Sequence, residues 1–447
     1  MNKQLPERPD LDQLKKQAKD LLKEIHAGQP EALARVPQNE IAGFALADAQ
    51  RIIAREYGFA SWAKLKERVE LSGPALAAHT LLRAALHGQA EQAAALLREF
   101  PRLSRADIQL AAALGDATGV RDWLAHDPAL ATRVSEVRNW TPLLSVCLGR
   151  VGGDDASRAD CARQLLAAGA DPNSYWTDTQ YPDAKLPALY AATGINNYPL
   201  VARVLLAAGA NPNDGESVYH AAERNHVESL QALLEGGADL GQRNEQWKNT
   251  PLYFLLGHSP VTHQGMAARA GIVWLLEHGA NPNVPAYDER EVPLFQAIRN
   301  GWDLDLVETF LKHGADARAE RRDLYSLADY AVRCGREDVV ALLVKHGAVR
   351  NPVPLDEFLG ALASGDTARA RHWLIERPSW AEEQSDVILR IITDRIKRGE
   401  IGALETALEL GLDFNLPDEK GETPLHYAAL HGQLAVVRRL IAHRATL

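Results

Sequence analysis

A short phrase recurs along the chain and constrains its fold more than any other feature. The phrase consists of two leucines or their equivalents, a short gap, a Gly-Ala pair and often Asp-Pro-Asn or Asn-Pro-Asn. Its copies begin, in chain order, at Leu165, Leu205, Leu233, Leu275, Phe310, Leu342 and, in a drifted form, Leu408. Self-similarity of this kind indicates a repeat architecture, in which each unit packs only against its neighbours. We therefore expect an elongated array and not one compact core.

A second phrase precedes each copy of the first by roughly twenty residues. It is complete as Thr-Pro-Leu at Thr141, Thr250 and Thr423, and weaker around Pro187 and Pro293. A threonine side chain can accept a bond from a free N–H at a helix start, and proline is harmless in the first turn. The glycine of the first phrase suits the left-handed position just after a helix. Each unit is thus predicted to contain two helices, the first starting at Thr-Pro and the second ending at glycine.

These two phrases together resemble the ankyrin family, whose repeats span about 33 residues and carry a Thr-Pro-Leu-His-x-Ala signature. The resemblance covers residues 76–447, or about eleven helix–turn–helix units, and implies an all-α ankyrin-repeat solenoid with loop or hairpin fingers. Units at 76–137 and 354–415 are degenerate because they lack the Thr-Pro phrase. Insertions near 151–156 and 258–266 break the period and are expected to project from the edge opposite the fingers.

The first 75 residues are predicted to form a separate, cap-like helical segment. Asp10 is expected to begin a helix that stops at Gly28, and two further helices are predicted at 46–57 and 61–71. This segment resembles one placed before ankyrin arrays in many bacterial proteins, a resemblance that implies no activity.

The spacing of Gln50, Ala54 and Gly58 also echoes a DNA-binding helix-turn-helix. A DNA-linked regulator acting through residues 46–71 is therefore kept as a second alternative. Two features weaken it. The apolar position expected after the turn is displaced to Leu65, and glutamates dilute the basic residues around it.

Composition argues against several classes of protein. The net charge is -10, from 49 basic and 59 acidic residues, so general binding to nucleic acid is disfavoured. Only 3 cysteines are present, in no metal-binding spacing, and no signal region or long apolar run is evident. We expect a cytoplasmic protein with no membrane partner.

No motif for phosphate binding, metalloprotease or serine hydrolase chemistry occurs. His258 and His263 flank a loop without a third ligand nearby. His278, His313 and His346 precede the glycine in three units and are expected to be structural. We predict no catalytic residue, no metal and no cofactor, and an enzyme is not the favoured interpretation.

In ankyrin arrays, partners occupy a concave face formed by the fingers and the first helices. The resemblance places the fingers here at 134–140, 173–186, 240–249, 283–291, 317–323 and 415–422. Their tips are unusually aromatic, and the predicted partner-binding residues are Trp140, Tyr175, Trp176, Tyr181, Trp247, Tyr287 and Asp288. Trp and Tyr dominate interface hot spots. The predicted function is therefore a protein–protein interaction scaffold.

The long finger at 173–186 leaves one more alternative open. With Tyr175, Trp176 and Tyr181 it could act as a lid over the concave face. The chain would then be a small-molecule-binding protein, or an unrecognised enzyme, with an aromatic pocket near Trp176 and Trp247.

Overall fold

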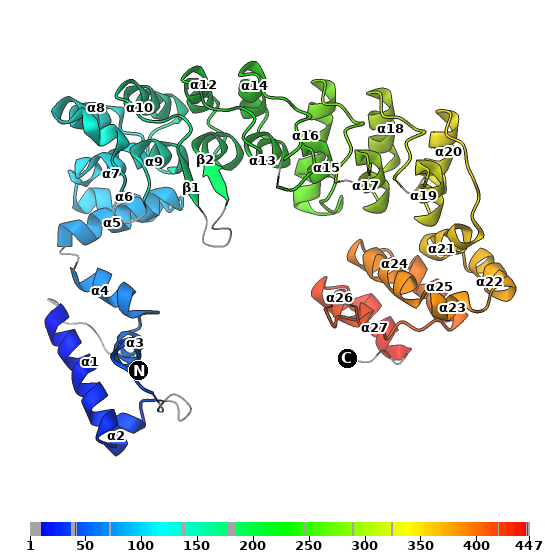
Figure 1. The fold of residues 1–447 in the computed structure, drawn as a ribbon, viewed down its shortest axis with the longest axis horizontal. Coiled ribbons are helices and arrows are strands. Elements are labelled where there is room, and N and C mark those ends of the chain that lie inside the picture. Colours follow the sequence, from blue (N-terminus) through cyan, green and yellow to red (C-terminus); the bar gives the residue numbers. More distant parts are fainter. Residues whose placement is uncertain are drawn as a thin grey trace. The chain divides into compact units, whose positions relative to one another are not determined.

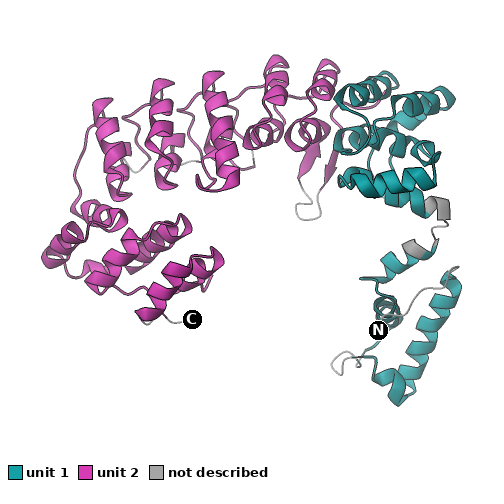
Figure 2. Ribbon diagram, turned by 180° about the vertical axis from the view of Figure 1, so that it is seen from behind, with its two compact units in different colours: residues 1–168 teal, residues 169–447 magenta. Residues whose placement is uncertain are grey.

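The computed structural model describes residues 10–36, 41, 43–70, 73–135, 139–177, 184–244, 246–287, 290–322, 325–418, 420–443 and 445. The chain divides into two compact units, residues 1–168 and 169–447 (Figure 2). Pairs of antiparallel helices account for most of the described residues, and the predicted helical repeat fold is confirmed (Figure 1). None of the described helices has both the length and the apolar character needed to cross a bilayer.

The first unit opens with a small helical segment that has its own core. Its helices are α1 (Leu11–His26), α2 (Pro30–Leu33), α3 (Leu46–Glu56) and α4 (Trp62–Glu70). A side-chain oxygen of Asp10 accepts a 2.8 Å bond from the N–H of Asp12 and caps α1. Leu14, Leu21, Ile53 and Leu65 are buried together at the centre. Three of these helices match the predicted ones closely, whereas the short α2 was not expected.

Helix pairs follow in the rest of the first unit. They are α5 (Gly73–Leu86) with α6 (Ala90–Glu99), α7 (Ile108–Ala113) with α8 (Ala117–His126), and α9 (Pro142–Leu148) with α10 (Asp155–Ala167). The first helices of successive pairs pack side by side, α5 against α7 and α7 against α9. The hydroxyl of Thr141 accepts from the N–H of Leu144, so this threonine caps α9 as predicted.

The insertion before α10 is anchored by hydrogen bonds from one arginine side chain. The side chain of Arg158 is fully buried beneath it. Its guanidinium donates to the carbonyl oxygens of Ala113 and Val146, both at 3.1 Å, and to those of Val151 at 2.8 Å and Gly153 at 3.0 Å. The insertion is therefore tied to the helix of the preceding repeat.

The second unit opens with a hairpin of strands β1 (Tyr175–Thr177) and β2 (Lys185–Pro187), in which Trp176 pairs with Leu186. Helix α11 (Ala188–Tyr190) continues into a π-helical turn, η4 (Ala191–Ile195), and is paired with α12 (Pro199–Ala207). The next pairs are α13 (Ser217–Glu223) with α14 (Val227–Glu235), α15 (Pro251–Leu255) with α16 (His263–Glu277), α17 (Pro293–Arg299) with α18 (Leu304–Lys312), and α19 (Leu327–Arg333) with α20 (Glu337–Lys345). In Figure 1, the first helices form one row and the second helices another.

The repeated glycines adopt the predicted left-handed conformation, which only glycine enters without strain. Their φ angles range from 70° to 96° at Gly169, Gly209, Gly237, Gly279, Gly314, Gly347 and Gly411. The apolar residue four positions before the glycine is fully buried in the six clearer copies, at Leu165, Leu205, Leu233, Leu275, Phe310 and Leu343. In the copy that begins at Leu342, the equivalent core residue is therefore the second leucine of the pair.

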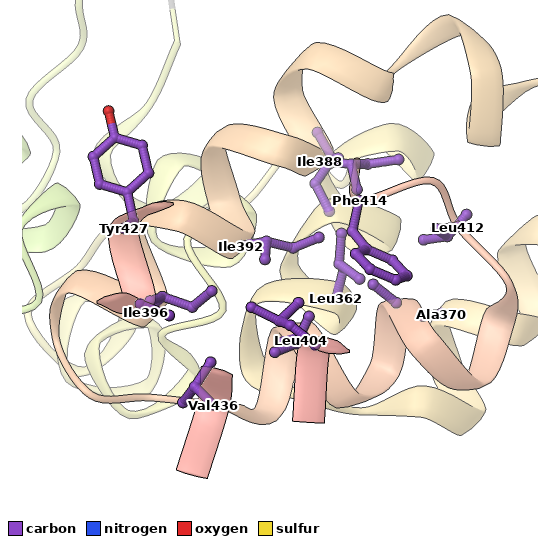
Figure 3. Packing of buried hydrophobic residues seen from close by; sticks show 14 of the residues in the cluster. Leu362, Ala370, Ile388, Ile392, Ile396, Leu404, Leu412, Phe414, Tyr427 and Val436 are labelled. Carbon is purple, nitrogen blue, oxygen red and sulfur yellow. The ribbon is translucent and has the colours of Figure 1, made fainter. Parts of the chain in front are cut away.

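The end of the second unit closes around a separate core. Its helices are α21 (Pro354–Ser364), α22 (Thr367–Glu376), α23 (Trp380–Glu383), α24 (Ser385–Lys397), α25 (Gly402–Leu410), α26 (Pro424–Leu430) and α27 (Leu434–Ala442). Ile392 from α24 packs among Leu362 and Leu404, beside Phe414 (Figure 3). Helix α24 has 13 residues and is longer than the other first helices of this unit.

Candidate interaction surface

A row of aromatic rings runs along the first helices of the second unit. Tyr190, His220 and Phe254 occupy equivalent positions in α11, α13 and α15, immediately after the position of histidine in the Thr-Pro-Leu-His phrase. Because these helices stack in phase, equivalent side chains of neighbouring repeats meet. The ring centroids of Tyr190 and His220 are 5.0 Å apart, and those of His220 and Phe254 are 5.6 Å apart.

The row extends by one ring at each end. At the hairpin end, Trp176 stacks on Tyr190 with centroids 5.8 Å apart and planes inclined by only 8°. At the other end, the ring of His258 meets Phe254 edge-on at 5.6 Å. We call these five residues the aromatic ladder: Trp176, Tyr190, His220, Phe254 and His258. All five are partly exposed to solvent.

Close approach between the ladder's second and third rings depends on Gly194. A Cβ atom at this position would lie 2.7 Å from the ring of Tyr190 and 2.8 Å from Cβ of His220. Both distances are shorter than any ordinary contact. The small residue in η4 therefore allows the two rings to meet across the boundary between repeats.

Carboxylates surround the histidine at the centre of the ladder. Nδ1 of His220 lies 2.8 Å from Oε2 of Glu223, and its Nε2 lies 3.3 Å from Oε2 of Glu216. Burial alone would lower the pKa of His220, but the two carboxylates outweigh it and raise the pKa to about 9. His220 is therefore a cation at neutral pH.

Glu223 also contacts the last ring of the ladder. Its Oε1 lies 3.0 Å from Nε2 of His258, so one carboxylate joins two neighbouring repeats. Burial opposes ionisation of Glu223, yet its hydrogen bonds with His220 and His258 hold its pKa far below the ordinary value. The ladder thus combines aromatic faces with the carboxylate of Glu223, whose depressed pKa favours the ionised form.

The structure places the predicted aromatic residues in different surroundings. Trp176 is part of the ladder. Its neighbour Tyr175 is 46% exposed, with Nζ of Lys185 located 4.9 Å from its ring centroid. Trp247 is 53% exposed at a finger tip, where the side chain of Asn244 accepts from its N–H at 3.0 Å.

The remaining predicted residues fall into three groups. Tyr287 is 47% exposed and directs its ring edge-on to Tyr253, with centroids 5.6 Å apart. Trp140 is partly buried in the first unit, and its carbonyl accepts from Gln109 at 3.0 Å. Tyr181 and Asp288 lie outside the described residues.

Sequence reasoning missed four of the five ladder residues. Tyr190, His220 and Phe254 occupy the variable position of the signature, and the residue type differs among these three repeats. The sequence gives no reason to assign His258 to a metal site, and its partner in the structure is Glu223 of the preceding repeat. Among the described residues, no three metal-ligating side chains converge on one point.

The helix-turn-helix suggested within residues 46–71 differs from a DNA-binding one in its turn. Ala54 is fully buried and Gly58 is left-handed, with φ of 82°, as that motif requires. However, α3 ends at Glu56 and α4 begins at Trp62. The intervening turn is longer than the three or four residues typical of the motif.

Comparison with protein families identifies the repeats. A model of three ankyrin repeats matches residues 265–352, and a model of ankyrin repeats in many copies matches residues 392–441. These two stretches of the chain contain ankyrin repeats. The sequence-based prediction of this architecture is thereby confirmed.

Two curated relatives of the chain are eukaryotic. It is 29% identical over 167 residues to the mouse B-cell lymphoma 3 protein homolog, which covers 34% of either chain. It is 22% identical over 345 residues to the ankyrin repeat protein nuc-2 of Neurospora crassa, which covers 73% of this chain and 28% of the relative. The chain thus spans about a third of the length of these relatives, and they give no support to the bacterial resemblance of its first 75 residues.

Solved ankyrin domains are similar to parts of the chain. The human ASB11 ankyrin repeat domain is 19% identical, with 55% of this chain and 100% of that chain covered and a TM-score of 0.39. The ankyrin repeat domain of Bcl-3 is 25% identical, with 47% and 87% covered and a TM-score of 0.39.

Proposed function

We propose that this ankyrin-repeat protein binds another protein through the aromatic ladder and the exposed finger tips Tyr175, Trp247 and Tyr287. Ankyrin repeats generally serve as protein-interaction modules, and the comparisons name no partner for this chain. The observation that carries the proposal is the ladder itself. Its partly exposed rings are held in contact with one another across three repeats. Because the rings are already ordered, little conformational entropy is lost on binding.

The chemistry of the ladder favours a partner segment that carries cations on an apolar background. Aromatic faces attract guanidinium and ammonium groups, more strongly when water is excluded. Glu216 and Glu223 lie beside the central ring and contact the imidazole of His220. An arginine or lysine of the partner would therefore meet both a ring face and a carboxylate.

Two substitutions test this proposal with a matched control. Trp176→Ala removes the ladder's outer ring and Trp247→Ala removes an exposed tip, while Met266→Ala removes an apolar side chain that is 60% exposed on the second helix α16. A pull-down from native cells, quantified by mass spectrometry, should recover one protein with the wild type and with Met266→Ala. Recovery should fall at least tenfold with either tryptophan variant, because each removes an interface aromatic.

Equal recovery of that protein by all four chains would refute the proposed surface. Melting temperatures must accompany the pull-down, since a variant that loses its fold would also lose its partner. Trp247→Ala should melt within about 2 °C of the wild type, because an exposed side chain contributes little to stability.

The alternative of a small molecule held by the tryptophans receives less support. One face of Trp176 is already covered by Tyr190, to which it is nearly parallel. A lid would need that face to be free for its ligand. Thermal protection by a metabolite library that is lost in Trp176→Ala, but kept in Met266→Ala, would favour this alternative.

A further inference from the structure

Two neighbouring finger tips of the second unit are joined by the side chain of one arginine. The first finger precedes α15 and carries Trp247 and Lys248, and the second precedes α17 and carries Tyr287. Nη2 of Arg243 donates to the carbonyl oxygen of Lys248 at 3.2 Å and to that of Tyr287 at 3.1 Å. One guanidinium group therefore bonds to the tips of two successive repeats.

Backbone hydrogen bonds complete the connection between the two tips. The N–H of Tyr287 donates to the carbonyl oxygen of Lys248 at 2.7 Å, so this oxygen accepts both from Arg243 and from the next finger. Within the first finger, the N–H of Lys248 donates to the carbonyl oxygen of Asn244 at 2.8 Å. The first tip is thus closed on itself and bonded to its neighbour.

Both tips contain a residue with a strained backbone. The φ angle is 52° at Lys248 and 50° at Tyr287. This left-handed region is unfavourable for residues that carry a side chain, because Cβ crowds a carbonyl oxygen. In the last repeat, the position equivalent to Lys248, two residues before the threonine of Thr-Pro-Leu, is Gly421, with φ of 79°. Lysine therefore holds strain at a position where glycine would not.

The arginine that joins the tips carries a cost of its own. Nε of Arg243 is buried and meets no acceptor among the described residues. A buried donor without a partner is unfavourable. Strained conformations persist only where the surrounding structure enforces them, and they cluster at functional sites. Three local costs at one pair of finger tips favour a functional role for their geometry.

The carbonyl oxygens at these tips do not require an arginine for their satisfaction. Lys248 is exposed, and Tyr287 is 47% exposed. Water can donate hydrogen bonds to carbonyl oxygens at exposed positions about as well as a side chain can. What Arg243 adds is a fixed relation between the two tips, which water cannot supply.

We propose that Arg243 is a positioning residue, which fixes Trp247 and Tyr287 relative to each other for contact with the partner protein. This inference rests on the proposed function, in which both aromatic side chains contact the partner. Trp247 is 53% exposed, and the ring of Tyr287 rests edge-on against Tyr253. Aromatic anchors that are already fixed lose less conformational entropy on binding. Arg243 acts through the tips and needs no contact with the partner.

Hydrogen exchange of the full chain, measured by mass spectrometry, tests the positioning directly. Arg243→Gln should accelerate exchange about tenfold in the peptides that contain the N–H groups of Lys248 and Tyr287, because the tips then open more often. Arg318→Gln is the matched control, since Nε of Arg318 donates to the carbonyl oxygen of Gly347 at 3.1 Å from a different finger. It should leave exchange in these peptides at the wild-type rate.

The pull-down from native cells connects the tips to partner binding. The probe is the protein that the wild type recovers and that Trp247→Ala loses. Arg243→Gln should lower recovery of this protein about fivefold or more, whereas Arg318→Gln should match the wild type. The melting temperature of Arg243→Gln should stay within about 3 °C of the wild type, which excludes a general loss of fold.

Rescue by glycine distinguishes positioning from direct contact with the partner. Glycine enters the left-handed region without strain, so a tip with Lys248→Gly needs less help from the arginine to stay closed. The double variant Arg243→Gln/Lys248→Gly should therefore regain at least half of the lost protection from exchange and of the lost recovery. Lys248→Gly alone should recover the partner as the wild type does.

The outcomes separate this inference from the proposed function. Unchanged recovery by both Trp247→Ala and Tyr287→Ala would overturn the finger tips as an interface, and the role of Arg243 with them. If these variants lose the partner and Arg243→Gln does not, the proposed function stands and the positioning role is refuted. Loss of the partner by Arg243→Gln with wild-type exchange and no rescue by glycine would also refute it, because Arg243 would then contact the partner directly.

Discussion

His220 and His258, from neighbouring repeats, contact the two oxygens of one carboxylate, that of Glu223. The contact distances are 2.8 Å to Nδ1 of His220 and 3.0 Å to Nε2 of His258. In an array whose stability is a sum of neighbour contacts, a charge shared across a repeat boundary couples the two units. The aromatic ladder is therefore also an electrostatic link.

This link predicts a specific dependence of stability on pH. The folded pKa of His220, about 9, exceeds its ordinary value of 6.5, so its stabilising contribution is complete below pH 6.5 and is lost as pH rises through 9. Because the pKa of Glu223 is depressed, its contribution is present above its ordinary value of 4.5 and is lost as pH falls. The pair of His220 and Glu223 therefore contributes most to stability between pH 4.5 and pH 6.5.

Substitution of the histidine isolates the effect. Between pH 6.5 and 9.5, the free energy of unfolding of the wild type should fall by about 1 to 3 kcal/mol more than that of His220→Gln. Urea denaturation at half-unit intervals of pH measures the difference. Parallel pH profiles for the two chains would contradict the assignment of charge to His220.

Substitution of Gly194 should disturb the close packing between Tyr190 and His220. Gly194→Ala would normally gain a few tenths of a kcal/mol by restricting the unfolded chain. Here the new methyl would lie 2.7 Å from the ring of Tyr190 and 2.8 Å from Cβ of His220, so overpacking should destabilise the protein by about 1 to 3 kcal/mol. Gly241→Ala is the control, because its nearest neighbour would be 3.5 Å away. Thermal melting should show a loss for the first variant only.

The sequence predicted the repeat well because each signal for it is local. Thr141 and Thr250 cap the helices that they were expected to cap, and Gly209 is left-handed as its position requires. These features depend on residues only a few positions apart. A single sequence is therefore sufficient to locate them.

The candidate sites depend on distant neighbours and were not predictable in the same way. Tyr190 and His220 are 30 positions apart and differ in chemistry, so nothing in either repeat alone marks them as a contacting pair. Arg299 and Arg398 meet only because of how successive repeats stack in the second unit. Their spacing of 99 residues carries no local pattern that would reveal this contact.

Substitution of Leu342 or Leu343 tests which of the two leucines is the core residue of its repeat. Counting from the leucine pair makes Leu342 the core residue, whereas counting back from Gly347 selects Leu343, which is fully buried. Leu343→Ala should therefore cost about 2 to 5 kcal/mol, and Leu342→Ala considerably less. Chemical denaturation of the two variants decides between them. A larger loss for Leu342→Ala would show that the copy follows the other register.

The buried guanidinium of Arg158 donates hydrogen bonds to backbone carbonyl oxygens, and its removal should destabilise the protein. Arg158→Met preserves most of the side-chain volume but removes donors to four carbonyl oxygens, which would then be buried without these partners. The expected loss is about 3 kcal/mol or more. It should be concentrated at the insertion, where the N–H of Gly153 also donates to Leu114 at 2.7 Å.

Thiol labelling gives a direct local measure of that loss. Burial raises the pKa of Cys147 and of Cys161 to about 12, so both thiols should react very slowly in the wild type. Arg158→Met should accelerate their labelling at least tenfold, because opening of the insertion exposes them. The exposed Arg163 on the same helix is the control, and Arg163→Met should label at the wild-type rate. Labelling of Arg158→Met at the wild-type rate would contradict the prediction. It would show that the insertion stays closed without the four hydrogen bonds of Arg158.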